Sequence, residues 1–389
     1  MAPHRSAYFL LGVIYLGFVS LGLPDGTLGV AWPSIAAELQ LPIGLAGAIT
    51  IVVTLLSGIS GFASGKIVAR FRTGPVVLTS CALTGLALLA IAHAPGLAWL
   101  MLAAVPLGLG AGAVDAGLNG YVARHYSGRH MNWLHACWGV GATCGPLVMG
   151  QAVSLGHGWR GGYLVLGSVQ LGLAALFLVT LPLWTRVPER TIAASLDGHA
   201  DKHPTTPANS FAGWLSPALF ALYAALELAT GLWAASILVL GRGFTAERAA
   251  WCVAGFYGAI TVGRILVGFI VERVGNRRVV AFGVALALAG AGAFAFAESP
   301  LLAAGSLGLI GLGFAPVYPG LMHEVPRRFA PDAAQTVIGR QSGAAYLGMA
   351  VLPAALGWLA QHALGGVVWV LVAGIVVLLL GIRRLDRMT

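Results

Sequence analysis

Long apolar runs alternate with short polar loops along almost the whole chain. Twelve of these runs are long enough to cross a membrane, because a hydrocarbon core of about 30 Å needs roughly 20 helical residues. The pattern predicts an all-α membrane protein with twelve transmembrane helices. Their approximate limits are 7–33, 43–68, 75–93, 97–122, 131–155, 161–184, 213–240, 249–271, 277–297, 300–323, 337–360 and 364–382.

Composition and charge agree with this prediction. The 389 residues are 58% hydrophobic and 9% charged, about a third of the charged fraction of a soluble domain. The net charge of +9 is no sign of nucleic-acid binding, because the basic residues lie in short loops, as the positive-inside rule expects. Among the loops on the other side, only Arg160, Arg242 and Arg248 are basic. We therefore expect a multi-pass protein of the plasma (cytoplasmic or inner) membrane with both termini in the cytoplasm.

One long polar segment divides the chain into two halves. Residues 186–211 predict a cytoplasmic linker, too short for a catalytic domain, between six-helix bundles at 1–185 and 212–389. The halves repeat in parallel: residues 65–72 match 268–275 and residues 108–110 match 311–313, both at an offset of 203. Asp25 matches Glu227 at an offset of 202. Two such pseudo-symmetric bundles are typical of transporters with a site near the membrane midplane.

Asp25 stands in the first apolar run, between Pro24 and Gly26. A carboxylate at membrane depth is costly, and distorted backbone is tolerated there only next to protein or water. These residues predict a proton or substrate site that faces a cavity. The alternative is a helix-end loop in which Asp25 contacts external water.

A second polar group follows in the fourth and fifth runs. Asp115 and Asn119 are four residues apart and share one helix face, which predicts a proton site at Asp115 and a substrate contact at Asn119. The alternative for Asp115 is a structural hydrogen bond to a neighbouring helix. His135 is a candidate for transport chemistry or a packed hydrogen-bonding residue.

The second half carries its own candidates. Glu227 lies near the middle of the seventh run. It is a candidate for a second proton site, for an acceptor of hydrogen bonds from substrate hydroxyls, or for a partner of Arg340. Arg340 and Gln341 open the eleventh run. Gln341 is a candidate for the substrate pocket, and the Arg340 guanidinium could bind a substrate carboxylate instead of Glu227. Aromatic residues suited to sugar rings, or to core packing, are Trp32, Trp133, Trp138, Trp233, Tyr318 and Tyr346, with Trp233 and Tyr318 ranked highest.

The loop Gly268–Arg278 reads GFIVERVGNRR and resembles the signature loop of the major facilitator superfamily, G-x-x-x-(D/E)-R-x-G-x-(R/K)-(R/K). The resemblance covers nearly the whole chain. It implies a charge cluster that latches a cytoplasmic gate, formed by Arg264, Glu272, Arg273, Arg277 and Arg278. The first-half copy has Ala69 in place of the acid, so the latch is expected mainly in the second copy. A basic loop that serves only topology is the alternative.

Helices 1, 4 and 5 also resemble the fucose–proton symporter family and its sugar-transporter relatives. That family has an acid in helix 1, and in helix 4 an acid followed four residues later by Asn. The resemblance places Asp25 and Asp115 at the acid positions and Asn119 at the Asn position, with Asp in place of the usual Glu at 115. It implies proton-driven uptake of a sugar or similar polyol.

The predicted function is a proton-coupled symporter of a sugar or similar small polar solute, working by alternating access. We expect a monomer in the lipid bilayer, with a small-molecule substrate, protons as coupling ion, no other cofactor, no metal and no nucleic-acid partner. Nucleotide-binding, nucleophile and zinc motifs are missing from the sequence, which argues against an enzyme. Two alternatives stay open: a proton-driven antiporter that exports a drug or organic anion, and a non-transporting sensor or assembly protein.

Overall fold

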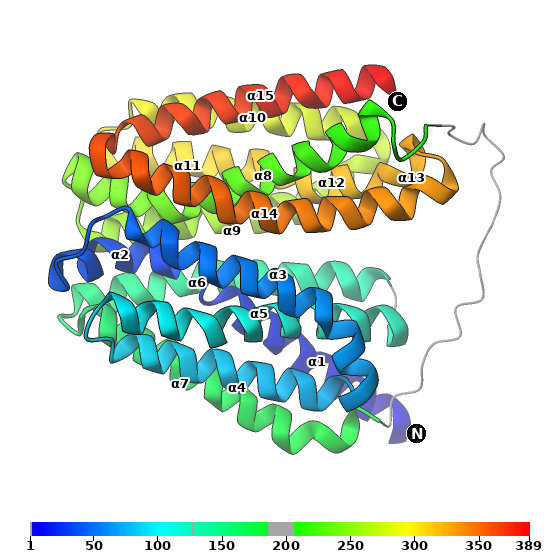
Figure 1. Ribbon diagram of the computed structural model, residues 1–389, viewed down its shortest axis with the longest axis horizontal. Helices are drawn as coiled ribbons and strands as arrows, with labels where there is room; N and C mark the ends of the chain where they lie inside the picture. The colour runs from blue at the N-terminus through cyan, green and yellow to red at the C-terminus, as the bar shows by residue number, and fades with distance from the viewer. Residues whose placement is uncertain (1, 127, 186–205) are drawn as a thin grey trace. The chain divides into compact units, whose positions relative to one another are not determined.

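The computed structural model describes residues 2–126, 128–185 and 206–389, and all regular structure in these ranges is helical (Figure 1). The helices of the first half are α1 (Ala2–Gly22), α2 (Thr27–Glu38), α3 (Leu45–Phe71), α4 (Thr73–Ala92), α5 (Leu97–His125), α6 (Gly128–Ser154), α7 (Gly158–Thr180) and the 3₁₀ turn η1 (Leu181–Leu183). Those of the second half are α8 (Phe211–Ser236), the π-helical turn η2 (Ile237–Gly241), α9 (Ala246–Val274), α10 (Asn276–Ala295), α11 (Pro300–Phe314), α12 (Val317–His323), α13 (Val325–Arg328), α14 (Pro331–Ala363) and α15 (Gly366–Met388).

Eleven spans in the described residues are long and apolar enough to cross a membrane. They correspond to eleven of the twelve predicted segments and confirm an all-α membrane fold. The remaining segment, 131–155, forms the 27-residue helix α6. Its glycines, together with Asn132 and His135, make it less apolar than the other eleven.

Several helices begin where the sequence supplies a hydroxyl cap. The hydroxyls of Ser210, Thr245 and Ser299 accept hydrogen bonds from the backbone N–H groups of Gly213, Arg248 and Leu302. Each bond satisfies an N–H that has no acceptor within its own helix. These caps fix the starts of α8, α9 and α11.

The chain forms two compact units. Unit 1 comprises Met1–Pro42 and Ala48–Ala194, and unit 2 comprises Ile43–Gly47 and Ser195–Thr389. Most of the predicted linker, from 186 to 205, lies outside the described residues. In unit 1, α4 packs between α5 and α7, and α1 packs on α6; in unit 2, α8 packs on α14 and α15, and α11 packs on α9 and α10.

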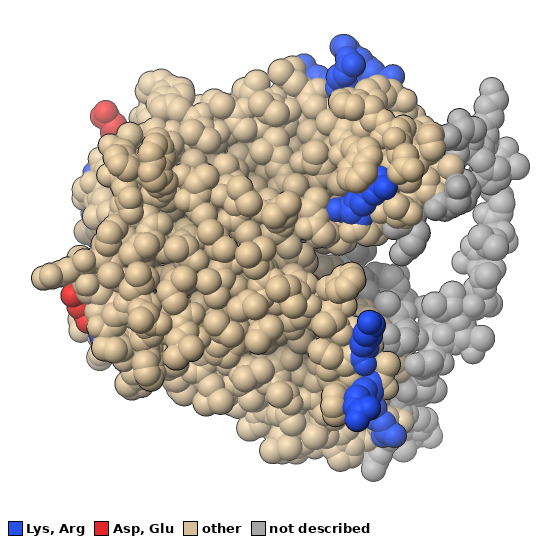
Figure 2. Space-filling model, in the orientation of Figure 1, with Lys and Arg blue, Asp and Glu red and all other residues tan. Residues whose placement is uncertain are grey.

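The outer faces of the helices are apolar. Phe62 and Leu301, for example, are 95% and 85% exposed, as expected for side chains that contact lipid. Figure 2 shows the basic side chains of each unit gathered near helix ends, with wide uncharged flanks. This distribution suits a bundle whose flanks lie in hydrocarbon and whose helix ends reach the headgroups.

Candidate functional site

Asp25 lies in a break between α1 and α2. Gly26 has a φ of 71°, a left-handed conformation that glycine adopts without strain, and Pro24 cannot donate a helical hydrogen bond. The break is closed by short local bonds, including Asp25 N to Gly22 O at 3.0 Å. The helix distortion predicted around Asp25 is therefore present.

Helix α6 approaches this break closely because it carries glycines at the contact. A Cβ added to Gly141 would collide with the Val19 carbonyl of α1, and one added to Gly145 with the Leu23 carbonyl. Such close backbone approach is a common use of small residues in membrane helices. It brings the Trp138 indole to Asp25, and Nε1 donates to Oδ2 at 2.7 Å.

Asp115 and Asn119 lie on one face of α5, as their spacing predicts. The Asn119 side-chain amide donates to Asp115 Oδ1 at 2.9 Å. Among the described residues, Asp115 makes no ion pair. A neutral donor leaves the carboxylate free to take up a proton without separating an ion pair. His135 packs edge-on against Phe18, with ring centroids 5.7 Å apart.

In unit 2, Glu227 of α8 pairs with Arg264 of α9. Their closest nitrogen–oxygen distance is 3.7 Å. The Tyr223 hydroxyl, one turn earlier on α8, donates to Glu227. The pairing of Glu227 with Arg340 that the sequence left open is therefore not formed. Arg264 faces Glu227 rather than the predicted cluster at Glu272.

Phenylalanine rings pack on the two tyrosines next to this ion pair. Tyr223 packs edge-on against Phe314, and Phe220 packs against Tyr318, with centroids 5.7 Å and 4.9 Å apart. Tyr318 is 41% exposed and stays a candidate for solute contact. Trp233 is fully buried and donates from its indole to the Pro353 carbonyl at 3.1 Å, which is a packing role.

A second group of polar contacts in unit 2 lies in the first third of α14 (Pro331–Ala363). Gln341 is fully buried and donates to the Ser216 hydroxyl at 2.9 Å, which ties α14 to α8. Arg340 donates to the Ala208 carbonyl at 2.6 Å, and its guanidinium lies 4.0 Å from the Trp214 ring centre. Both predicted substrate residues thus make contacts within unit 2.

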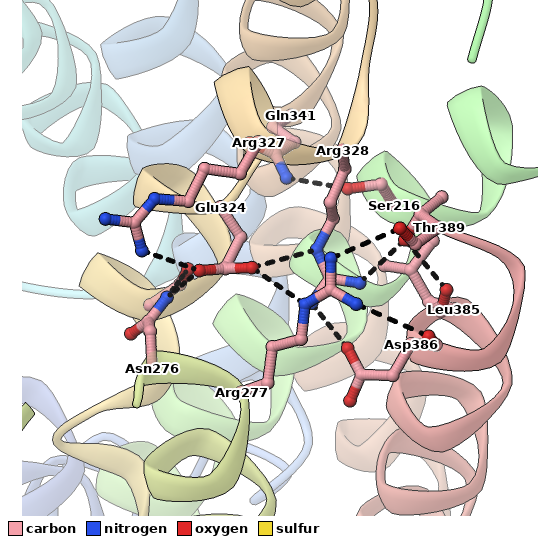
Figure 3. Close-up of polar contacts among 11 residues, drawn as sticks. Ser216, Asn276, Arg277, Glu324, Arg327, Arg328, Gln341, Leu385, Asp386 and Thr389 are labelled. Atoms are coloured by element: carbon pink, nitrogen blue, oxygen red, sulfur yellow. Dashed lines mark hydrogen bonds and ion pairs between the residues drawn. The ribbon is translucent and has the colours of Figure 1, made fainter. Parts of the chain in front are cut away.

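A dense charge cluster lies at the ends of α10, α12, α13 and α15 (Figure 3). Its centre is Glu324, 4% exposed, which pairs with Arg277 at 2.9 Å and Arg327 at 3.2 Å. Arg328 is also buried and pairs with Asp386 of α15 at 2.5 Å. Burial raises the pKa of Glu324, but its bonds with Arg277 and Asn276 and the nearby Arg328 outweigh this, so the pKa lies below its usual value.

This cluster differs from the predicted latch. Arg277 belongs to it, whereas Glu272, Arg273 and Arg278 are exposed and form no ion pair with another described residue. Sequence reasoning missed Glu324, Arg328 and Asp386. An available signal was the acid–arginine spacing of four at 324 and 328, directly after an apolar run.

Comparisons with known proteins place the chain among transporters. The family pattern described as Major Facilitator Superfamily matches residues 14–245 and 215–387. A niacin transporter of Acinetobacter baylyi is 28% identical over 165 residues, 41% of this chain and 37% of that protein. A cis,cis-muconate transport protein of the same organism is 25% identical over 248 residues, 62% of this chain and 59% of that protein. The matches thus span about a third and three fifths of these relatives.

Solved structures show the same fold at low sequence identity. A bacterial homologue of the human lysosomal transporter Spinster, in an inward-facing and occupied conformation, aligns with a TM-score of 0.74 and 14% identity. The alignment covers 100% of this chain and 98% of that one. A mutant of the nucleoside transporter NupG aligns with a TM-score of 0.72 and 14% identity, over 97% and 98% of the two chains.

Proposed function

This chain belongs to the major facilitator superfamily, and on that premise we propose that it is a secondary transporter of a small polar solute. It works by alternating access, is driven by protons and needs no other cofactor. It resides in the plasma membrane as a monomer with both termini in the cytoplasm. The supporting observation is Asp115 in the span Leu97–Val122, hydrogen-bonded to the neutral Asn119.

The reasoning starts from the cost of the charge. An ionised carboxylate inside a membrane span costs about 2.5–3.5 kcal/mol on insertion scales, so the group must serve a purpose or have a partner. Proton uptake removes that charge. Asp115 therefore suits reversible protonation, and Asp25, held beside Trp138 in the helix break, is the second proton site.

Two solute classes follow from different observations. A sugar or polyol is implied by the resemblance of helices 1, 4 and 5 to the fucose–proton symporter family. An organic anion is the second candidate, because the two curated relatives are named for niacin and cis,cis-muconate, which are both carboxylic acids. Symport is proposed for either class, with antiport as the alternative direction.

A ligand screen tests the solute class first. Binding to the folded state raises the apparent melting temperature by mass action. The purified protein is heated with L-fucose, sorbitol, nicotinate, cis,cis-muconate and a cationic drug such as tetraphenylphosphonium. Proteoliposomes are then assayed for uptake of the stabilising compound under an inward proton gradient. A compound that binds but never accumulates would count against transport and favour a sensor.

A further inference from the structure

We propose that Glu227 and Arg264 form an exchangeable anion site. In this site a solute carboxylate replaces Glu227 as the partner of Arg264 when Glu227 takes up a proton. The inference rests on the proposed transport function and deepens it by naming the solute class. It also gives Arg264 a role in solute binding, in place of the predicted gate.

The pair lies deep within two membrane spans. Glu227 is fourteen residues before the end of the span Phe211–Gly241, and Arg264 is ten residues before the end of Ala246–Val274. At 1.5 Å per residue, both charges lie roughly 15 Å or more from the nearest span end. A pair at this depth is a functional candidate by default.

The pair is also accessible. The side chains of Arg264 and Glu227 are 20% and 16% exposed, and the nearby Tyr318 is 41% exposed. A charged group at this depth is costly where it contacts hydrocarbon, so the exposed parts of these two side chains must face water or a polar solute. A small solute can therefore reach the guanidinium.

The contact between the two charges is loose. The closest nitrogen–oxygen distance of 3.7 Å exceeds the 2.9 Å between Arg277 and Glu324 in the buried cluster. Arginine binds a carboxylate best through two parallel hydrogen bonds from its planar fork. A solute that forms both bonds gains more from Arg264 than Glu227 does at its present distance.

Charge balance makes the exchange feasible in a membrane. The empty site holds one negative and one positive charge, and the loaded site holds neutral Glu227, Arg264 and the anion. Neither state leaves an uncompensated buried charge, which is the costly situation. One proton and one anion enter together, so loading this site changes no net charge.

The other polar groups near the pair are neutral hydroxyls. Tyr223 of α8 donates to Glu227, the Tyr257 hydroxyl of α9 lies against Gly231, one turn after Glu227, and Tyr318 of α12 lies near Arg264. Arg340 of α14 bonds to the segment before α8, and Asp386 of α15 bonds to Arg328. Tyr318, which is 41% exposed and packs on Phe220, offers a ring on which a flat, conjugated carboxylate can stack.

Nicotinate and its uncharged amide, nicotinamide, provide a matched pair of probes for the full-length protein. Titration calorimetry should show binding of nicotinate at least about tenfold tighter than nicotinamide. Because binding takes up a proton, nicotinate affinity should fall as the pH rises, by at most about tenfold per pH unit.

Variants then assign the two roles. Glu227→Gln, which mimics the protonated acid, should bind nicotinate with an affinity that no longer changes with pH. Arg264→Gln should weaken nicotinate binding by about tenfold or more, without weakening nicotinamide. Arg384→Gln, at an exposed position of α15, is the control and should match the wild type. If Arg264→Gln unfolds, the charge-balanced double variant Glu227→Gln/Arg264→Gln replaces it and should also lose nicotinate selectivity.

Three results would overturn the anion site: no preference for nicotinate over nicotinamide, unchanged selectivity without Arg264, or full pH dependence in Glu227→Gln. The proposed transport function is judged separately. Sugar accumulation without carboxylate binding would remove the anion site and keep the transporter. Carboxylate binding as described, without accumulation of any solute, would keep the anion site and contradict the proposed transport function.

Discussion

Asp25 in unit 1 and Glu227 in unit 2 occupy matching positions of the sequence repeat, but their surroundings differ. Asp25 lies in a helix break and accepts a hydrogen bond from an indole of α6. Glu227 lies in the unbroken helix α8 and pairs with a guanidinium of α9. The offset of 203 places Gly61 at the position of Arg264, so unit 1 has no arginine there.

Each half of the sequence repeat has an acid at this position, but the two acids have different partners. In unit 1, Asp115 can lose its charge without breaking an ion pair, which suits a site that drives the conformational cycle. In unit 2, Glu227 can lose its charge only if another anion takes its place beside Arg264. The comparison supports the proposal that unit 1 carries proton-driven switching and that unit 2 carries the solute's charge.

The largest expected effect is a difference in proton-driven solute accumulation between variants of Asp115 and Glu227. Asp115→Asn should reduce proton-driven accumulation to the level of empty vesicles while solute exchange continues, because the switching proton is lost. Glu227→Gln should lower accumulation without abolishing it, since the unit 1 acids still couple. Uptake under an imposed pH gradient, measured beside exchange at equal pH, checks both variants. Unchanged accumulation in Asp115→Asn would remove this residue from coupling.

A second test contrasts the exchangeable pair with the fixed cluster around Glu324. Glu324→Gln should lower the free energy of unfolding by about 3–5 kcal/mol, because three arginines lose a buried partner. Glu272→Gln, at an exposed position, is the control and should change it little. Thermal unfolding in detergent provides the measurement.

The lowered pKa of Glu324 also fixes the sign of a pH effect. A depressed carboxyl pKa contributes stability above the usual glutamate range, and this contribution is lost as pH falls through the native pKa. Wild-type protein should therefore lose stability on acidification below about pH 4.5, and Glu324→Gln should lack that component. Identical acid profiles would mean that the cluster does not hold the helix ends together.

A third test compares two helix glycines, one in each unit. Gly141 and Gly343 are 202 residues apart, but only Gly141 is in tight contact with a neighbouring backbone. Gly141→Ala should cost about 1–3 kcal/mol, because α1 must move away from α6. Gly343→Ala meets nothing within 4 Å and should be nearly neutral. Equal melting temperatures for the two variants would contradict the close α1–α6 contact.

The smallest effect concerns the response to external pH. Asp25 lies in the outer half of the first predicted run, whereas Asp115 lies in the inner half of the fourth. Asp25→Asn should flatten the dependence of uptake on external pH and leave efflux sensitive to internal pH. Vesicles with the two pH values set independently measure both. A full external response in this variant would reduce Asp25 to a hydrogen-bonding group at a helix end.

The sequence predicted features that depend on local pattern. Apolar run length located the spans, Pro24 and Gly26 located the helix break, and the spacing of 115 and 119 placed both side chains on one helix face. It could not predict contacts between helices. Glu227 and Arg264 are 37 residues apart on separate spans, and Trp138 reaches Asp25 only through the glycine contact. Trp233 was ranked by its position in a helix, which does not reveal whether an indole is buried.

The most direct test of proton-coupled symport is to measure whether adding solute drives protons into proteoliposomes. Proteoliposomes loaded with a pH-sensitive dye, at equal pH on both sides, receive nicotinate, cis,cis-muconate or L-fucose. Empty liposomes and Asp115→Asn vesicles report passive entry of the undissociated acid. We predict that at least one solute acidifies the lumen in wild-type vesicles beyond both controls. Alkalinisation by that solute would indicate antiport, and no change with any solute that binds would contradict proton-coupled transport.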